Sequence, residues 1–583
     1  MVHLRKLLAG IGLGALAALI VLAIGASTDL LDRVELTTYD WRMRLAADPA
    51  SVNKNIVLVK IDDSSIRRMA PTFGRWPWPR LAMSFGIDFL KRGPAKVVAV
   101  DVILAEQDKV VESYAFDAGT PGEEHWSAAQ SEHALVESLQ KANNVILLAD
   151  AVYEGLADQT LDKNVSKWNG SPFHAGRLAE PRPFVLPPLQ ALGEAATGLG
   201  HNFLTRDDDG PARRMAPFIS NNGKELPSLG VAAALRAGGF KPDDVAPDGE
   251  AIRIGDRRVP LVSRRLPDHV QRTMLINFRA PALVKNAAGE LETPYPSYSF
   301  ADLFYAEQDI LEGKSPRIDP AMFKDKIVFV GMTASGLLDV FGTPMSSGEN
   351  GSMPGIQLHA SMADSILANR FIEPASNRSR IGSVIITALA IGLLGAFLPF
   401  AIAAGASFAI LGGWTFFAVA AFRGGSWLNL VQPVAAGGLA LFFGTAYQYF
   451  IEGREKRRVS KLFGRYVSKD VYAQLMSNPD LAQLGGKRRE MSVLFSDIRG
   501  FTSVTERGDP EELVRQLNEY FSRMVEIVFK HKGTVDKFVG DMVMALFAAP
   551  LDDPDHAENA VKAAIEMIFV LAELNKGIGR AHV

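Results

Sequence analysis

Long uncharged runs separate the parts of the chain that can face lipid from the parts that must face water. Residues 7–28 carry no charge, and residues 381–400, 401–422 and 427–451 form three later runs of the same kind. A helix needs about 20 apolar residues to cross a bilayer. The pattern predicts four transmembrane helices, with Pro399 at the turn between the second and the third. A cleaved signal peptide is the alternative for the first run.

Basic residues beside these runs indicate the orientation. The segment "EGREKRRVSK" at 452–461 is rich in arginine and lysine, and Arg5 and Lys6 precede the first run. Such clusters mark the cytoplasmic side of a span. Arg378 and Arg380 argue mildly against this orientation, because it places them outside. We therefore expect a multi-pass protein of the bacterial inner (plasma) membrane, with residues 1–6 and 452–583 in the cytoplasm and residues 29–376 outside.

The outer region, 29–376, has the pattern of a parallel α/β fold. The runs Asn55–Asp63 and Ala95–Leu104 are β-branched and end in acids, and a helical pattern around Leu81–Lys91 lies between them. Strand, helix, strand is the repeating unit of a parallel sheet. Lys324–Ala334 is a further strand of this type. Ligands of such sheets bind at the strand ends, which makes this region a candidate binding domain.

Few side chains of the outer region point to chemistry by themselves. Trp76 and Trp78 stand between prolines and favour a packed turn over an aromatic ligand cage. Asp62, Asp63 and Asp101 follow strands and can either cap helices or bind a ligand. His201 and His359 are interpreted as ordinary hydrogen-bonded histidines, not as metal ligands.

Composition removes several classes of function. The net charge is −3, so no general attraction to nucleic acid or to acidic lipid is expected. The chain contains no cysteine, which excludes disulfides, thiolate metal sites and cysteine nucleophiles.

The motifs "TTYDWRMRL", "FGRWPWPR", "INFRAP", "KIVFVGMTASGLLDVFGTP" and "MPGIQLHASMADSIL" follow one another across the outer region. Together they resemble the CHASE2 extracellular sensor domain. The resemblance implies reception of an unknown extracytoplasmic ligand, and it implies no chemistry for this region.

The last part of the chain, 491–583, has a different pattern. Met491–Ile498 predicts a buried strand, a helix follows Asp509, and Val535–Val539 and Met542–Phe547 predict a hairpin. With a second helix after the hairpin, the order is β-α-β-β-α, most of an α+β ferredoxin-like unit.

Two acids are brought together by that order. Asp497 ends the first strand, and Asp541 lies in the hairpin turn, so both belong to one edge of the sheet. Neighbouring carboxylates repel each other unless a cation lies between them, and oxygen ligands suit Mg²⁺. Gly500 lets the chain turn so that backbone N–H groups can face phosphate. The pattern predicts a metal and triphosphate site. Singly, a helix cap and a turn residue are the alternatives.

"LFSDIRGFTSVTE" and "VDKFVGDMVMALFAAP" resemble the two front motifs of the class III nucleotide cyclases. The resemblance implies that Asp497, Asp541 and the carbonyl of Ile498 bind two Mg²⁺ (or Mn²⁺) ions. It also implies that the backbone at Gly500, Phe501 and Thr502 meets phosphate, and that Lys537 selects the base.

The implied reaction is cyclisation of ATP to cyclic AMP and pyrophosphate, controlled by the outer sensor. Lysine at position 537 goes with adenine in this family and glutamate with guanine. A lysine can donate to the ring nitrogen that accepts in adenine. A guanylate cyclase is the less favoured alternative. The family works as a head-to-tail dimer, so a homodimer is implied, and no nucleic acid is expected as a partner.

Two features frame this catalytic domain. The segment 452–490 carries apolar residues at helical spacing and is interpreted as a signalling linker that self-associates. After Asp541, the chain reaches Val583 without the family's ribose-positioning asparagine and its transition-state arginine. We therefore expect an incomplete catalytic domain, with an inactive receptor that binds ligand and dimerises as the alternative function.

Overall fold

The computed structural model describes most of the chain. It describes residues 2–578 except 109–113, 116–124, 152–172, 222, 267–268, 337–338, 347–350, 464–487 and 502–508. The chain divides into two compact units, Met1–Phe443 and Gly444–Val583. Each unit is described below by itself.

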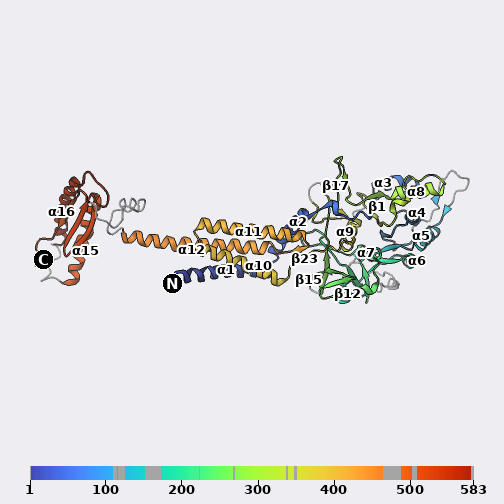
Figure 1. The fold of residues 1–583 in the computed structure, drawn as a ribbon, viewed down its shortest axis with the longest axis horizontal. Coiled ribbons are helices and arrows are strands. Elements are labelled where there is room, and N and C mark those ends of the chain that lie inside the picture. The colour runs from blue at the N-terminus through green and yellow to red at the C-terminus, as the bar shows by residue number, and fades with distance from the viewer. Residues whose placement is uncertain are drawn as a thin grey trace. The chain divides into compact units, whose positions relative to one another are not determined.

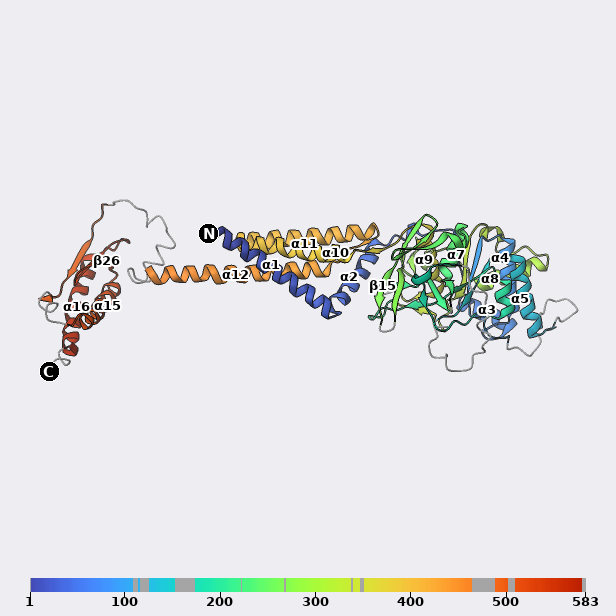
Figure 2. The ribbon, with the colours of Figure 1, turned by 90° about the horizontal axis from the view of Figure 1, so that it is seen from below.

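A six-stranded sheet forms the centre of the outer domain (Figures 1 and 2). All its neighbouring strands are parallel. In spatial order the strands are β19 (Ser297–Ser299), β1 (Ile56–Ile61), β20 (Ile327–Met332), β2 (Val97–Asp101), β5 (Val145–Ala149) and β7 (Gly198–His201).

The predicted parallel α/β fold is present, with one difference in strand order. Helix α4 (Arg80–Arg92) lies between β1 and β2 in the sequence, as expected. The two strands are not neighbours, however, because β20 lies between them and pairs with both. β20 can take this place since all five residues from Ile327 to Gly331 are buried, as a central strand of a covered sheet requires.

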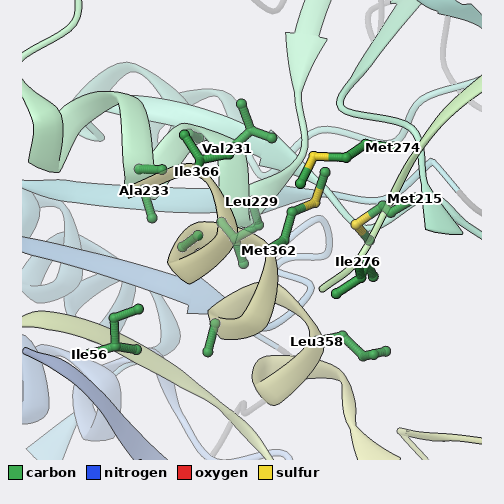
Figure 3. Packing of buried hydrophobic residues seen from close by; sticks show 14 of the residues in the cluster. Ile56, Met215, Leu229, Val231, Ala233, Met274, Ile276, Leu358, Met362 and Ile366 are labelled. Atoms are coloured by element: carbon green, nitrogen blue, oxygen red, sulfur yellow. The ribbon is translucent and has the colours of Figure 1, made fainter. Parts of the chain in front are cut away.

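Helices cover both faces of this sheet. On one face α7 (Leu229–Gly238) packs against α9 (Gly355–Leu367), and Figure 3 shows the side chains that meet there. The other face is covered by α3 (Asp63–Phe73), α4, α5 (Ala128–Ala142) and α8 (Phe300–Leu311). Every residue of β2 and β5 is buried as a result.

Short strands and helices complete the outer domain. They are β3 (Tyr114–Ala115), β4 (His125–Trp126), β6 (Glu180–Pro181), α6 (Gln190–Ala195), β8 (Leu204–Thr205), β9 (Arg214–Met215), β10 (Phe218–Asn221), β11 (Lys224–Pro227), β12 (Val245–Asp248), β13 (Ala251–Ile254), β14 (Arg257–Pro260), β15 (Val262–Arg265), β16 (Val270–Leu275), β17 (Val284–Lys285), β18 (Leu291–Glu292), β21 (Val340–Phe341), β22 (Met353–Pro354) and β23 (Glu373–Pro374).

Long apolar helices run beside one another next to this domain (Figures 1 and 2). Three described helices are long and apolar enough to span a membrane: His3–Ser27 within α1 (Val2–Ser27), α10 (Asn377–Phe397) and α11 (Phe400–Arg423). Pro399 immediately precedes α11, at the predicted turn. The fourth predicted span is not among the three. The helix there, α12 (Val431–Phe463), follows the short strand β24 (Ser426–Trp427).

Helices α1 and α10 approach each other very closely. A Cβ atom on Gly14 would lie 2.6 Å from the carbonyl oxygen of Ala388, and one on Gly392 would lie 2.6 Å from that of Gly10. Small residues permit this approach, as in many membrane helix pairs. Ala436 of α12 belongs to the same buried cluster, so α12 packs into the helix group as well.

A buried ion pair within α2 (Leu30–Ala46) is hydrogen-bonded to the start of α12. Glu35 pairs with Arg42 and accepts hydrogen bonds from the indole of Trp427 at 3.0 Å and from the backbone N–H of Leu430 and Val431 at 2.9 Å each. Arg42 in turn donates to the Leu428 carbonyl at 2.7 Å. A carboxylate here satisfies N–H groups at the first turn of α12 and complements its helix dipole.

The C-terminal unit contains a three-stranded antiparallel sheet with helices packed on one face. Its elements follow the predicted β-α-β-β-α order: β25 (Ser492–Ser496), α15 (Pro510–Lys530), β26 (Thr534–Val539), β27 (Met542–Phe547) and α16 (His556–Ile578). The spatial order is β25-β27-β26. Asp509 caps α15, accepting from the Glu512 N–H at 3.4 Å, and Pro510 stands in the first turn, both as predicted. Of the predicted linker, residues 464–487 lie outside the described residues.

Candidate active site

The structure brings Asp497 and Asp541 to one end of the sheet. β25 and β27 are antiparallel neighbours, with Ser496 opposite Val543. Asp497 follows directly after Ser496. Asp541 precedes β27 in the hairpin turn, where Gly540 has a φ of +66°. Glycine adopts this conformation without the steric cost that a side chain would add.

The two carboxyls interact with each other. The Ile498 N–H donates to Asp541 Oδ2 at 3.1 Å and to Asp497 Oδ1 at 3.1 Å, so both acids converge on one amide. A hydrogen bond with the Asp541 carboxyl, some burial and the charge of Asp541 raise the pKa of Asp497. Adjacent carboxyls raise each other's pKa in this way, because two negative charges at close range repel each other. The predicted proximity of the two acids is confirmed.

The turn after Asp497 is also placed as the sequence indicated. Gly500 has a φ of +78°, and the Phe501 N–H donates to the Ile498 carbonyl at 3.2 Å. That carbonyl keeps a second lone pair and can still accept or coordinate. Thr502 lies outside the described residues, so the predicted phosphate turn is described only as far as Phe501.

A β-bulge, which the sequence pattern did not predict, determines on which face of the sheet Lys537 lies. Val535 pairs with Ala545, yet Lys537 pairs with Met544, so Asp536 is an extra residue in the ladder. Paired residues share a face of the sheet, and successive residues alternate between faces. The bulge therefore places Lys537 with Met544 and Phe495 on the face away from the helices.

Asp497 belongs to that same face, since it lies two residues beyond Phe495. The face carries exposed apolar side chains: Val493 is 43% exposed and Phe495 58%. The opposite face is buried against α15 and α16 through residues such as Val543 and Phe547. One face of the sheet thus carries Lys537, Asp497 and the exposed apolar side chains of Val493 and Phe495.

Tyr520 supports the end of β25, next to Asp497, and this contact was not predicted from the sequence. Its hydroxyl lies 3.0 Å from the Ser496 hydroxyl, and burial, more than the charges of Asp541 and Asp497, raises the pKa of Tyr520. In the sequence, Tyr520 lies on the apolar face of α15, and that position predicts a core residue without indicating a contact with β25. The Nζ atom of Lys537 lies 3.3 Å from Oδ2 of the neighbouring Asp536.

The donor set suits a magnesium-type ion. Two carboxylates and one backbone carbonyl are hard oxygen ligands, which Mg²⁺ takes in small number while keeping water and phosphate on its other positions. Among the described residues, no group of three or more histidine, aspartate or glutamate side chains is arranged to hold a metal by itself. A two-carboxylate site that is completed by a nucleotide agrees with both observations.

The candidate residues of the outer domain have mixed outcomes. Trp78 is buried and stacks on Phe300, with Trp76 edge-on against it, so the packed-turn interpretation is confirmed. Asp62 caps α3, accepting from the Ser65 N–H at 2.7 Å. His201 is hydrogen-bonded at one nitrogen only: its Nδ1 accepts from the Phe203 N–H at 3.0 Å, and its Nε2 is buried without a partner. His359, interpreted as hydrogen-bonded, instead has an Nδ1 atom that is buried without a partner.

Sequence profiles of two families match the chain. The CHASE2 domain matches residues 15–397, and the adenylate and guanylate cyclase catalytic domain matches residues 486–579. The chain belongs to the CHASE2-domain family and carries a class III adenylate/guanylate cyclase catalytic domain after its sensor.

Individual relatives match only part of the chain. Uncharacterized proteins of Mycobacterium bovis and Mycobacterium tuberculosis are 36% identical over 157 residues, which is 25% of this chain and 29% of theirs. The solved guanylyl cyclase Cya2 is 44% identical over 16% of this chain and 50% of its own, with a TM-score of 0.16. The adenylyl cyclase CyaB from P. aeruginosa is 36% identical over 16% of this chain and 52% of its own, with a TM-score of 0.15. The chain thus spans about half of these cyclases and less than a third of the curated relatives.

Proposed function

We propose that the protein is a membrane receptor that cyclises ATP to cyclic AMP under the control of its outer sensor domain. The observation that carries this proposal is the convergence of Asp497 and Asp541 on the Ile498 amide, with Lys537 on the same open face of the sheet. This arrangement offers acceptors for a divalent cation at one point and a donor for a base at another.

Each residue has a distinct task in this proposal. Asp497, Asp541 and the Ile498 carbonyl would hold two Mg²⁺ or Mn²⁺ ions, which would lower the pKa of the ribose 3′ hydroxyl and neutralise charge on the triphosphate. The backbone at Gly500, Phe501 and Thr502 receives phosphate oxygens. The 3′ oxygen attacks the α-phosphorus, its proton leaves to solvent, and pyrophosphate departs. No protein nucleophile is required.

Lys537 selects adenine in this account. Its ammonium group is a donor only, and the ring nitrogen on the Watson–Crick edge accepts in adenine and carries a proton in guanine. The side chain is exposed on the open face of the sheet, across β27 from Phe495, and so is available to a base. Its present neighbour Asp536 is an exposed pairing of little energetic weight.

A second copy of the chain is the proposed partner of the open sheet face. Val493 and Phe495 expose apolar surface beside Lys537 and Asp497. An apolar sheet face of this kind is typical of an association surface. A homodimer would cover it and would enclose the nucleotide between the two copies.

The junction at Glu35 supports regulation from outside. α2 is tied to the outer domain through Asp40, which accepts two hydrogen bonds of 2.7 Å from Arg213. The same helix holds the start of α12 through Glu35. We propose that α12 begins as the fourth membrane span, with the basic segment 452–461 on the cytoplasmic side, so that a shift of α2 reaches the linker.

Nucleotide selection tests this proposal. Membranes that contain the full chain are assayed for Mn²⁺-dependent nucleotide binding and for cyclic AMP and cyclic GMP formation. We expect ATP to be preferred, and Lys537→Glu to shift the preference toward GTP by about tenfold or more, since a mispaired buried donor costs about 1–3 kcal/mol. Lys532→Glu, outside the sheet, is the matched control and should change nothing.

Three outcomes separate the possible functions. Formation of cyclic AMP supports the proposed receptor cyclase. Binding of ATP without turnover favours an inactive receptor. Preference for GTP in the unmodified chain would contradict the role given to Lys537.

A further inference from the structure

A row of paired residues crosses the C-terminal sheet next to the two candidate metal ligands. Ser496 of β25 lies opposite Val543 of β27, and Val543 lies opposite Phe538 of β26. Paired residues share a face of the sheet, and Val543 is buried, so this row lies on the face that the helices cover. Asp497 follows Ser496 directly, and Asp541 lies two residues before Val543, so the row is close to both acids.

Two consecutive aromatic residues of α15 contact the two outer strands of this row. The hydroxyl of Tyr520 lies 3.0 Å from the hydroxyl of Ser496, within hydrogen-bonding distance. The centroids of the Phe521 and Phe538 rings lie 4.5 Å apart, in the range of favourable aromatic pairs. α15 therefore contacts both β25 and β26 at the end of the sheet where the acids lie.

The hydroxyl pair is largely shielded from water. Tyr520 is 6% exposed and belongs to the buried cluster of this domain. Removal of the Ser496 hydroxyl would leave the Tyr520 hydroxyl without this hydrogen bond in a buried position, which costs free energy. The contact therefore opposes movement of the end of β25 away from α15.

The end of β25 is important because both acids meet one amide there. The N–H of Ile498 lies 3.1 Å from Asp497 Oδ1 and 3.1 Å from Asp541 Oδ2. The ladder between β25 and β27 ends at Ser496 and Val543, so Asp497 lies just beyond its last pair. The distance between the two acids therefore depends on how the end of β25 is held against the hairpin.

We propose that Tyr520 is a positioning residue for the divalent-metal site. Its hydrogen bond to Ser496 sets the position of Asp497 relative to Asp541, and thereby the affinity for Mg²⁺ or Mn²⁺. Groups that orient metal-binding side chains act in this way without touching the metal. The effect on metal affinity rests on the proposed function, whereas the effect on the position of Asp497 does not.

Hydrogen exchange at single amides tests the positioning in the full chain, in lipid nanodiscs and without metal. Tyr520→Phe removes one hydroxyl and keeps the ring. We expect the Ile498 amide to exchange about two- to twelvefold faster, the factor that one net hydrogen bond represents. Exchange at Ala545, in the middle of β27, should not change. Ser522→Ala removes a hydroxyl at an exposed position of the same helix and is the matched control, which should change neither amide.

Reciprocal variants locate the effect in the hydroxyl pair. Ser496→Ala should speed exchange at Ile498 as much as Tyr520→Phe does. The double variant should add little, because both changes remove the same interaction. Ser496→Thr keeps the hydroxyl on a side chain that suits a strand and should preserve the exchange rate of the unmodified chain. A general loss of stability would instead be additive in the double variant.

Mn²⁺-dependent binding of ATP to the same variants tests the consequence for the metal site. We expect Tyr520→Phe to weaken Mn²⁺ binding in the presence of ATP by about two- to twelvefold. The preference for ATP over GTP should not change, because Lys537 lies on the opposite face of the sheet. Ser522→Ala should leave both the metal affinity and the nucleotide preference unchanged.

The outcomes separate the positioning role from the proposed function. Unchanged exchange at Ile498 in both Tyr520→Phe and Ser496→Ala, or an equal increase at Ala545, would overturn the positioning role. Faster exchange at Ile498 with unchanged Mn²⁺ affinity would overturn its effect on the metal site. If the unmodified chain binds no ATP with Mn²⁺, the proposed function fails, and exchange at Ile498 alone decides whether Tyr520 positions the acids.

Discussion

The outer domain and the C-terminal domain each have a sheet covered by helices, but only the outer sheet is covered on both faces. β2 and β5 of the outer domain are buried at every residue. β25 of the C-terminal domain alternates, with Val493 and Phe495 exposed. The outer domain thus completes its core within one chain, whereas the C-terminal sheet keeps an open face that holds the candidate catalytic residues.

This difference separates two kinds of task. A covered sheet is a rigid body whose strand ends can hold a small ligand, and the polar groups of the outer domain are indeed at those ends. An open sheet face can be completed by a partner, and we propose that a nucleotide and a second copy of the chain complete this one. The comparison predicts that similar substitutions have unlike consequences in the two domains.

The largest expected contrast comes from removing one phenylalanine in each sheet. Phe329→Ala in β20, where the side chain is fully buried, should lower the free energy of unfolding of the outer domain by about 3–5 kcal/mol. Phe495→Ala should cost its domain less than about 1 kcal/mol and should instead weaken dimerisation. Hydrogen exchange measures the stability of each domain, and analytical ultracentrifugation measures the dimer. Equal losses of stability would break the comparison.

The junction at Glu35 should show the next effect. Glu35→Gln leaves Arg42 buried without its carboxylate and should destabilise the contact between α2 and α12 by about 3 kcal/mol. Faster hydrogen exchange at residues 428–434, with unchanged exchange in β20, is the expected result. Thr37→Val, at an exposed position of the same helix, is the control. A response confined to the core of the outer domain would contradict a coupling role.

Acid should remove the contribution of one buried histidine to the stability of the outer domain. His359 has a pKa of about 3 when folded and near 6.5 when unfolded, so below pH 6.5 the unfolded chain binds a proton that the folded chain does not. Its contribution to stability is lost as the pH falls, by roughly 2 kcal/mol at pH 5. Burial lowers the pKa of His201 in the same sense, while buried carboxyls whose pKa is raised, such as Asp101 and Asp364, act in the opposite sense.

The C-terminal domain should behave differently. The pKa of Asp497 is raised, so its protonated form is favoured in the folded state and its contribution grows as the pH falls. Melting curves at pH 7 and pH 5 should therefore be compared between His359→Gln and the unmodified chain. The midpoint of the outer domain should lose less, or gain more, on acidification in His359→Gln, and an unchanged pH profile in this variant would contradict the neutral buried histidine.

Sequence periodicity predicted the helices and strands of both domains because the spacing of apolar residues shows which face of each helix or strand is buried. The β-α-β-β-α order, the cap at Asp509 and the meeting of Asp497 with Asp541 all follow from local patterns and from the antiparallel hairpin. The family motif predicted that Lys537 selects the base, but the sequence did not predict on which face of the sheet Lys537 lies. That face depends on the bulge at Asp536, which arises from tertiary pairing and leaves no mark in the sequence.

Dependence on tertiary packing also explains what the sequence did not predict in the outer domain and in the apolar helices. The place of β20 between β1 and β2 is a long-range pairing, which no local pattern encodes. His359 reads as an ordinary core histidine, because whether its ring finds a partner is decided by α9 packing on the sheet. The fourth uncharged run begins with residues that form β24, so its helix starts only at Val431.

Mn²⁺-dependent binding of ATP to the full chain measures whether Asp497 and Asp541 jointly hold divalent ions and ATP. We expect Asp541→Ala and Asp497→Asn each to reduce this binding below detection, while Asp536→Asn, which changes an exposed carboxylate on the bulge, should leave it within twofold of the unmodified chain. Unchanged Mn²⁺-dependent ATP binding in Asp541→Ala would show that the two acids do not hold the ions.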